Sequence, residues 1–447
     1  MSNLKIKVIS RNPEEYLRAT KRDIHKLPRN YDPNLHPLEA PREYVRAMNA
    51  VKLEKVYAKP FIGSLDGHSD GVSSLAKHPR RLAMLASGAF DGEIKLWDLT
   101  SRICTRSFIA HVGWVRDICF KPDGHSFISV GDDKTIKTWK TKVECEEDEE
   151  PKETRLSLSV VSGVTHHRQK PLFATCGEHC QLWNTNMSEP LKVFEWGVDS
   201  LHHVSFNQVE TDLLASCASD RSIILYDIRD TVPVRKVVME LRSNALSWNP
   251  MEAFIFTVAN EDYNLYTFDM RKLSQPVNIH MDNTSAVIDV DYSPTGREFV
   301  SGSYDRTVRI FESLKGHSRD VYHTKRMQRL TCVKWSLDNK YILTGSDDMN
   351  IRLWKARASE KLGILKPRER TALNYSEALK EKFANHPQIK RIARHRHVPK
   401  HQLNAQRELR TMRESAKRKE ANRRAHSKKG AVPFVPERKK HIVKEDE

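Results

Sequence analysis

Large apolar residues alternate with polar ones in short stretches along most of the chain. Two clear examples are residues 94–97 and 308–311, which read Ile-Lys-Leu-Trp and Val-Arg-Ile-Phe. An alternation of period two is typical of a strand with one buried face. A second apolar stretch upstream ends in a turn that contains proline, as at 115–122. The pattern predicts an all-β fold made of small antiparallel sheets.

The aromatic residue that closes each stretch recurs at steps of 42 to 44 residues. The series is Trp97, Trp139, Trp183, Tyr226, Phe268, Phe311 and Trp354. Six residues earlier, every copy except the third has an aspartate: Asp91, Asp133, Asp220, Asp262, Asp305 and Asp348. A short carboxylate at a turn can accept hydrogen bonds from turn amides. His68 and His111 open the first two copies, and the period is typical of WD-type propeller blades.

A single four-stranded sheet cannot bury both of its faces, whereas sheets stacked around a ring can. The seven copies therefore predict a seven-bladed WD-repeat β-propeller over residues 61–355. The seventh copy ends its third strand at Trp354. We expect residues 61–65 to supply the missing outer strand and so to close the ring.

The charge is distributed very unevenly. The formal net charge of the 447 residues is +17, and residues 356–447 hold 26 Lys and Arg against 11 Asp and Glu. Residues 1–60 hold 13 against 7, which leaves the predicted ring at −4. Two basic ends on a nearly neutral ring predict contact with a polyanion. Nucleic acid is favoured over a membrane surface, because the tail lacks a repeating apolar face.

Other features of the composition indicate an intracellular protein without a membrane span. No run of about 18 apolar residues occurs, and the first residues lack the apolar core of a secretory signal. Seven cysteines, an odd number, suit a reducing compartment.

The two ends are expected to differ in structure. Prolines divide residues 1–60, which predicts an extended basic arm with room for a short helix from Pro41. That arm would lie along another surface or pack on its own propeller. In the tail, Ala372, Tyr375, Leu379 and Phe383 form an apolar stripe of helical spacing, expected to dock on the propeller rim.

A basic stretch runs from Lys390 to Lys429, and its part from His401 to Lys429 predicts a helix that contacts RNA. Like charges oppose an isolated helix of this kind, and a phosphate backbone would relieve them. This basic stretch has no aromatic platform on which bases could stack, so contact with the RNA backbone is favoured over recognition of bases. The basic cluster at 417–429 would also serve as a nuclear import signal. The predicted RNA-binding residues are Lys390, Arg391, Arg394, Arg396, Lys400, Arg407, Arg410, Arg413, Lys417, Arg418, Lys419, Arg423, Arg424, Lys428 and Lys429.

Neither a metal site nor a catalytic site is predicted. One group of possible ligands is His166, His167, Cys176, His179 and Cys180. Their spacing is not that of a structural zinc site, and cysteines on strands usually serve as small apolar residues. No nucleophile accompanies the Asp-His pairs, so we expect a protein that is not an enzyme and has no cofactor. The acidic run 144–150 is expected to be a solvated loop.

The fourth and fifth copies end in related phrases, at 226–229 (Tyr-Asp-Ile-Arg) and 268–271 (Phe-Asp-Met-Arg). They would place two arginines on one face of the ring. The phrases resemble the paired WDxR-type signature of propellers that dock onto the cullin-4 ubiquitin ligase adaptor. The residues concerned are Asp227, Arg229, Asp269 and Arg271. The alternative is that each arginine only pairs with a neighbouring carboxylate.

Several phrases resemble the SOF family of nucleolar WD-repeat proteins. They lie at 30–33 (Asn-Tyr-Asp-Pro), 41–44 (Pro-Arg-Glu-Tyr), 260–266, 323–328 and 391–400. The resemblance implies a small-subunit processome component that is needed for pre-ribosomal RNA processing and associates with the box C/D guide ribonucleoprotein. Animal members are also described as cullin-4 substrate receptors.

The resulting hypothesis is a nucleolar assembly factor, a monomer within a large particle. The predicted division of the chain is an arm (1–60), a ring (61–355) and a helical tail (356–447).

Overall fold

The computed structural model describes residues 38–142, 150–197, 200–428 and 430–446. They form two compact units. Of the described residues, the ring unit contains those within Pro60–Ala358 and those from Arg396 onward, and the helical unit contains those from 38 to 59 and Ser359–His395. The division into arm, ring and tail stays a prediction, and the predicted tail contributes to both units.

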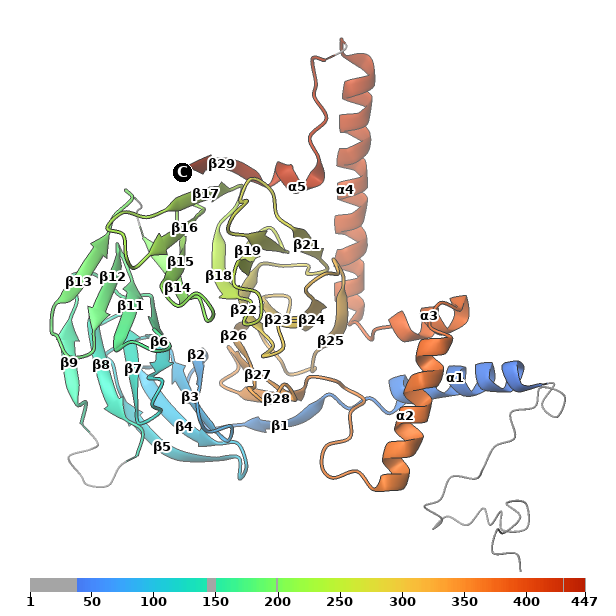
Figure 1. Ribbon diagram of the computed structural model, residues 1–447, viewed down its shortest axis with the longest axis horizontal. Helices are drawn as coiled ribbons and strands as arrows, with labels where there is room; N and C mark the ends of the chain where they lie inside the picture. Colours follow the sequence, from blue (N-terminus) through green and yellow to red (C-terminus); the bar gives the residue numbers. More distant parts are fainter. Residues whose placement is uncertain (1–37, 143–149, 198–199, 429, 447) are drawn as a thin grey trace, which may run out of the picture. The chain divides into compact units, whose positions relative to one another are not determined.

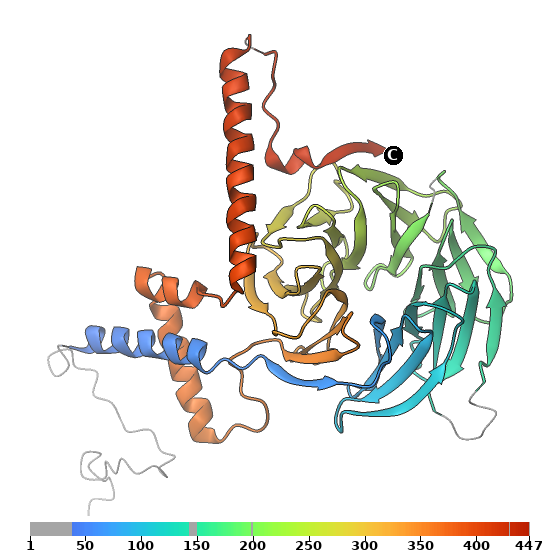
Figure 2. The ribbon, with the colours of Figure 1, turned by 180° about the vertical axis from the view of Figure 1, so that it is seen from behind.

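Seven antiparallel sheets form the ring, as the repeats predict (Figures 1 and 2). The innermost strand of each sheet packs against that of the next, and β26 packs against β2 to complete the circle. The first blade contains β2 (Val72–Lys77), β3 (Met84–Ala89), β4 (Glu93–Asp98) and β5 (Ile103–Ile109). The second contains β6 (Val115–Phe120), β7 (Ser126–Gly131), β8 (Thr135–Lys140) and β9 (Glu153–Leu156). The third contains β10 (Gly163–His166), β11 (Leu172–Cys176), β12 (Cys180–Asn184) and β13 (Pro190–Phe194). The fourth blade contains β14 (Leu201–Phe206), β15 (Leu213–Ala218), β16 (Ser222–Asp227) and β17 (Arg235–Met239). The fifth contains β18 (Ser243–Trp248), β19 (Ile255–Asn260), β20 (Asn264–Asp269) and β21 (Asn278–Met281). The sixth contains β22 (Val287–Tyr292), β23 (Glu298–Ser303), β24 (Val308–Glu312) and β25 (Ser318–Tyr322).

The seventh blade closes the ring in the predicted way. It contains β26 (Leu330–Trp335), β27 (Tyr341–Ser346) and β28 (Ile351–Lys355), and β1 (Phe61–Leu65) adds the fourth strand. Leu65 pairs with Ile351 and Phe61 with Trp354. The first and last strands of the ring therefore hold each other, and the described sheets leave no gap in the circle.

The repeated aspartate makes the turn before each third strand. Asp133 Oδ1 accepts a hydrogen bond from the Thr135 amide at 3.1 Å, and Asp220 Oδ1 accepts one from the Ser222 amide at 2.9 Å. The residue after the aspartate has a positive φ in six blades: Gly92, Lys134, Arg221, Tyr263, Arg306 and Met349. Residues other than glycine rarely adopt that conformation, and the carboxylate that holds the turn offsets the cost.

The repeated histidine and tryptophan belong to a buried hydrogen-bond chain. In the second blade, the Nδ1 of His111 lies 3.0 Å from Asp133, its Nε2 lies 2.7 Å from Ser129 Oγ, and Trp139 donates to the same hydroxyl at 2.9 Å. In the first blade, His68 lies 3.5 Å from Glu93. These residues stabilise the blades, and the connecting serine is the member that sequence analysis missed.

The helical unit confirms one expectation and corrects another. The helix expected to begin at Pro41 is present as α1 (Glu39–Val56), which packs against α2 (Pro367–Lys382) and α3 (Pro387–Arg394). Two residues of the predicted stripe, Leu379 and Phe383, pack with Ala47, Val51 and Ile389 in the core of this unit, where docking on the propeller rim was expected. The other two, Ala372 and Tyr375, are exposed. The arm before residue 38 lies outside the described residues.

The end of the chain holds a strand that was not expected. After α4 (Lys400–His426) and α5 (Glu437–Lys440), β29 (Ile442–Asp446) pairs antiparallel with β17 and extends the fourth blade to five strands. Ile442 packs against the core between the fourth and fifth blades. The open edge of β17 offers unpaired backbone groups, which explains why a weakly apolar segment forms a strand here. Within the described ranges, no helix combines the length and apolarity needed to cross a membrane.

Candidate nucleic-acid and partner interfaces

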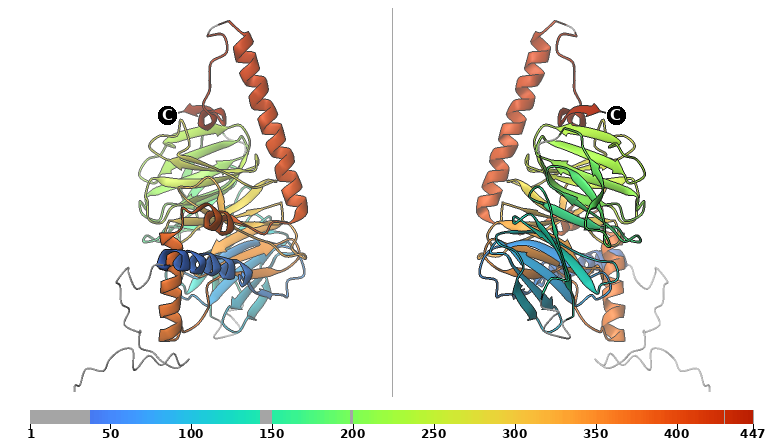
Figure 3. Two further views of the ribbon diagram at one scale, coloured as in Figure 1. Left: turned by 90° about the vertical axis from the view of Figure 1, so that its right-hand side faces the viewer. Right: turned by 90° about the vertical axis from the view of Figure 1, so that its left-hand side faces the viewer.

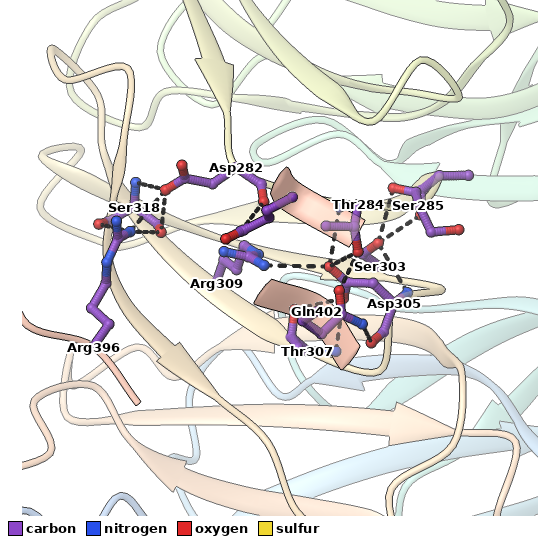
Figure 4. A network of polar contacts seen from close by, with 12 residues as sticks. Asp282, Thr284, Ser285, Ser303, Asp305, Thr307, Arg309, Ser318, Arg396 and Gln402 are labelled. Carbon is purple, nitrogen blue, oxygen red and sulfur yellow. Dashed lines mark hydrogen bonds and ion pairs between the residues drawn. The ribbon is translucent and has the colours of Figure 1, made fainter. Parts of the chain in front are cut away.

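Helix α4 is fastened to the ring at its N-terminal end by Arg396. Its Nη1 donates to Asp282 Oδ2 at 2.8 Å and to the Ser318 carbonyl at 2.7 Å (Figure 4). Burial tends to raise the pKa of Asp282, but hydrogen bonds from Ser318 and the charge of Arg396 outweigh it and lower that pKa. The carboxylate therefore stays ionised and keeps Arg396 in place.

Gln402 makes a second attachment in the first turns of α4. Its buried side-chain amide donates to the Asp305 carbonyl and accepts from the Thr284 hydroxyl (Figure 4). One turn later, Gln406 donates to the Asp282 carbonyl at 2.8 Å. Residues four apart lie on the same face of a helix, so α4 docks through a polar face rather than an apolar stripe.

The far end of α4 extends beyond the sheets, and the chain then returns to the fourth blade (Figures 1 and 3). Lys440 pairs with Glu420 at 2.8 Å, and the guanidinium of Arg424 lies 4.8 Å from the centre of the Phe434 ring. At the blade, His441 lies 3.7 Å from Asp262. The helix is thus held at its start and, through the returning chain, near its end.

The surface of α4 between these attachments is basic and exposed. The helix carries nine Lys and Arg against three Glu over 27 residues, or about 40 Å of axis. The exposed residues among the predicted RNA contacts of the ring unit are Lys400, Arg407, Arg410, Arg413, Lys417, Arg418, Lys419, Arg423 and Lys428. A row of cations at this spacing can neutralise several phosphates of one strand.

Not all of these cations are available to a ligand. Arg396 and Arg424 are half-buried in the attachments described above. Arg413 donates to Asn264 at 3.2 Å, and Arg410 pairs with Glu414 at 2.8 Å on its own helix. The remaining exposed cations of α4 have no partner among the described residues. Lys429 lies outside the described residues.

Three further predicted contacts belong to the helical unit. Lys390, Arg391 and Arg394 are exposed on α3, while Ile389 is buried against α1. The helix is amphipathic with a basic outer face. The predicted basic run from Lys390 onward is therefore divided between two units.

The arginines of the two related phrases are exposed at the ends of neighbouring third strands. Arg229 pairs with Asp212 at 2.9 Å and is 71% exposed, and Arg271 pairs with Asp269 at 2.8 Å and is 66% exposed. Asp227 and Asp269 also accept hydrogen bonds from the backbone amides of Arg229 and Arg271. Ion pairs this exposed contribute little stability, so both guanidinium groups remain accessible to a partner.

Three of the five residues considered as metal ligands have separate structural roles. Cys176 and Cys180 are buried cross-strand partners, and His167 accepts hydrogen bonds from the amides of Gln169 and Lys170. Burial raises the pKa of the Cys180 thiol to about 12, so it is not a thiolate at neutral pH. Among the residues that the structure describes, no three His, Cys, Asp or Glu side chains gather as a metal site requires.

Known proteins match this chain from end to end. The Sof1-like domain matches residues 356–442, and the WD domain, G-beta repeat, matches residues 59–98, 102–140, 274–312 and 312–355. The chain is 59% identical over 442 residues to DDB1- and CUL4-associated factor 13 of Danio rerio, a match that covers 99% of each chain. The protein of the same name from Homo sapiens is 58% identical over 441 residues, 98% of this chain and 99% of the relative.

A yeast relative is similar over the same length. Protein SOF1 of Saccharomyces cerevisiae is 45% identical over 464 residues, covering 98% of this chain and 94% of the relative. The match includes the ring and both ends, so the resemblance seen in the sequence phrases is confirmed. The chain belongs to the Sof1-like family of WD-repeat proteins.

Proposed function

We propose that this protein is a non-catalytic scaffold in ribosome biogenesis that holds protein partners on its ring and pre-ribosomal RNA on its basic helices. Membership of the Sof1-like family supports a role in ribosome biogenesis. A propeller supports the scaffold role, because its rigid ring positions loops on several surfaces at once. The partners proposed are the small-subunit processome proteins and the box C/D guide ribonucleoprotein, in the nucleolus of the nucleus, with one copy of this chain per particle.

One observation carries the RNA part of the proposal. Helix α4 is attached at its start by polar contacts to the ring, yet most of its cations face solvent without a partner among the described residues. Helical neighbours of like charge are destabilising, so this surface is costly unless a polyanion covers it. RNA phosphates would relieve the repulsion and release counterions on binding.

Replacing Lys417, Arg418, Lys419 and Arg423 by Ala tests this proposal. We expect weaker binding to a labelled single-stranded RNA and a salt dependence that falls by about 0.7 for each lost phosphate contact. Sedimentation with pre-ribosomal particles should decrease in parallel. The matched control replaces four exposed ring cations, Arg168, Lys272, Lys315 and Lys340, by Ala. Equal RNA affinity and salt dependence in both variants would refute the RNA contact.

A second function is favoured by the exposed Arg229 and Arg271. The relatives named DDB1- and CUL4-associated factor 13 carry a ligase association in their name, and the two arginines end related phrases in neighbouring blades. We propose that this face can dock a cullin-4 ligase adaptor. Arg229→Glu with Arg271→Glu should abolish recovery of the adaptor in a pull-down. Lys315→Glu with Lys340→Glu, at two exposed positions on other blades, serves as the matched control. Unchanged recovery of the adaptor would refute this second function. That result would leave the outcome of the RNA-binding test unaffected.

A further inference from the structure

A basic pocket opens between the first and second blades of the ring, away from α4 in the sequence and not among the predicted sites. It encloses about 430 Å³. The turn between β2 and β3, the turn between β6 and β7, the end of β8 with the two residues after it, and the residue before β9 supply its walls. Five cations line it: Arg80, Arg81, Lys140, Lys142 and Lys152.

Buried His78 ties the two turns together. Its Nε2 lies 2.9 Å from the carbonyl oxygen of Gly124, and its Nδ1 accepts hydrogen bonds from the amides of Arg80 and Arg81 at 3.1 and 2.8 Å. Gly124 has a φ of +75°, and a Cβ there would overlap the imidazole ring. The contacts between His78 and Gly124 therefore fix the shape of the pocket and hold Arg80 and Arg81 at its wall.

The pocket concentrates positive charge on a ring whose formal balance is negative. Residues 61–355 carry four more Asp and Glu than Lys and Arg, whereas the lining has five cations against one carboxylate, Asp123. Asp123 also accepts a hydrogen bond from the His125 amide at 3.1 Å. Burial lowers the pKa of His78, and the charges of Arg81 and Arg80 act in the same direction, against the bond to Gly124.

Four of the five cations, Arg80, Arg81, Lys142 and Lys152, keep their binding capacity. Arg80 uses Nε alone, toward the Pro122 carbonyl at 3.2 Å. The side chains of Arg81, Lys142 and Lys152 have no partner among the described residues, and all three are exposed. Several accessible cations spread across two blades suit a chain of phosphates better than one isolated anion, because each phosphate along the chain can meet a different side chain.

We propose that this pocket binds the phosphodiester backbone of single-stranded RNA and gives the ring an RNA contact of its own. The inference extends the proposed function, since it adds a second contact to that of α4. The lining offers mainly cations, so binding would follow phosphates rather than base identity. Lys142 and Lys152 flank the acidic run 144–150 in the sequence, and the experiment keeps that run intact so that its charge is included in every affinity.

The experiment uses the full chain and a fluorescein-labelled 20-nucleotide uridine RNA, measured by fluorescence anisotropy between 50 and 200 mM salt. The background carries the four α4 substitutions to Ala, so that the remaining affinity comes from elsewhere. Arg80→Glu, Arg81→Glu and Lys142→Glu together should weaken binding at least tenfold and reduce the salt dependence by about two. The matched control, Arg168→Glu with Lys272→Glu and Lys340→Glu, should change affinity less than threefold.

The outcomes separate this inference from the proposed function. Loss of binding on α4 substitution with no further loss on pocket substitution overturns the pocket and leaves the helix contact standing. No loss on α4 substitution followed by loss on pocket substitution supports the pocket and refutes the helix. The inference is also overturned if a phosphoserine peptide displaces the RNA while the pocket variant and the control variant bind RNA equally. If the triple variant melts early, Lys142→Glu with Lys152→Glu replaces it, because both residues are exposed and neither supports the turns.

Discussion

Arg396 Nη1 lies 2.8 Å from Asp282 Oδ2, although 114 residues separate them in the chain. The carboxylate comes from the loop after β21, and the guanidinium comes just before α4. Because both side chains are largely shielded from solvent, the pair sets where the basic helix leaves the ring. A residue from the basic tail thus serves to position its neighbours.

Breaking this pair should release the start of α4. Arg396→Ala leaves the Asp282 carboxylate short of a partner, which typically costs about 1–3 kcal/mol for a shielded group. We expect faster amide hydrogen exchange over residues 396–410 and little change in the melting of the ring. Arg407→Ala, an exposed position on the same helix, is the control and should leave the exchange unchanged. Slow exchange in the Arg396 variant would contradict the role of the pair.

Buried histidines should make the ring sensitive to mild acid. Burial lowers the pKa of His203 to about 3 and that of His280 to about 4, from the usual 6.5. Below pH 6.5 the unfolded chain binds protons that the folded ring cannot, so stability falls as the pH drops from 7 toward 4. Asp117, whose pKa burial raises to about 6, acts in the opposite direction, but the histidines with lowered pKa outnumber it. Urea midpoints at pH 7 and 5 measure the effect, and His203→Gln should reduce the difference. Equal midpoints at both pH values would argue against it.

The last strand should depend on one apolar contact. Ile442→Asp places a carboxylate against the core beside Met239, so we expect β29 to detach and amide exchange over residues 442–446 to become fast. Val443 points away and is 64% exposed. Val443→Asp is therefore a matched control that should keep the strand protected. Detachment of β29 in both variants would mean that the added negative charge, and not the loss of the Ile442 contact, releases the strand.

The helical unit should fold as one cooperative unit. Leu379 is 5% exposed between α1 and α3, and its replacement by Ala should destabilise the unit by about 2–4 kcal/mol through the lost contact and the cavity. Limited proteolysis should then cut residues 39–56 and 367–394 together. Leu373 is 44% exposed on the same helix, and Leu373→Ala should have little effect. Cleavage confined to α2 would show that α1 folds independently.

Local patterns along the chain were enough to predict the ring. Strand alternation, the spacing of the closing aromatics and the turn aspartates are local signals, and each blade repeats them because each packs only against its two neighbours. The same reasoning identified residues 61–65 as the closing strand, since the last copy lacks one strand and only the segment before the first copy remains to supply it.

The use of the two ends depends on contacts between distant parts of the folded chain. The packing of α1 on α2, the pairing of Arg396 with Asp282 and the addition of β29 to β17 join residues that are 100 to more than 300 positions apart. The pocket cations come from separate turns of two blades, and each turn alone looks like an ordinary solvated turn. Polar contacts of this kind leave no periodic trace in a sequence, because they depend on which surfaces the folded chain brings within reach of one another.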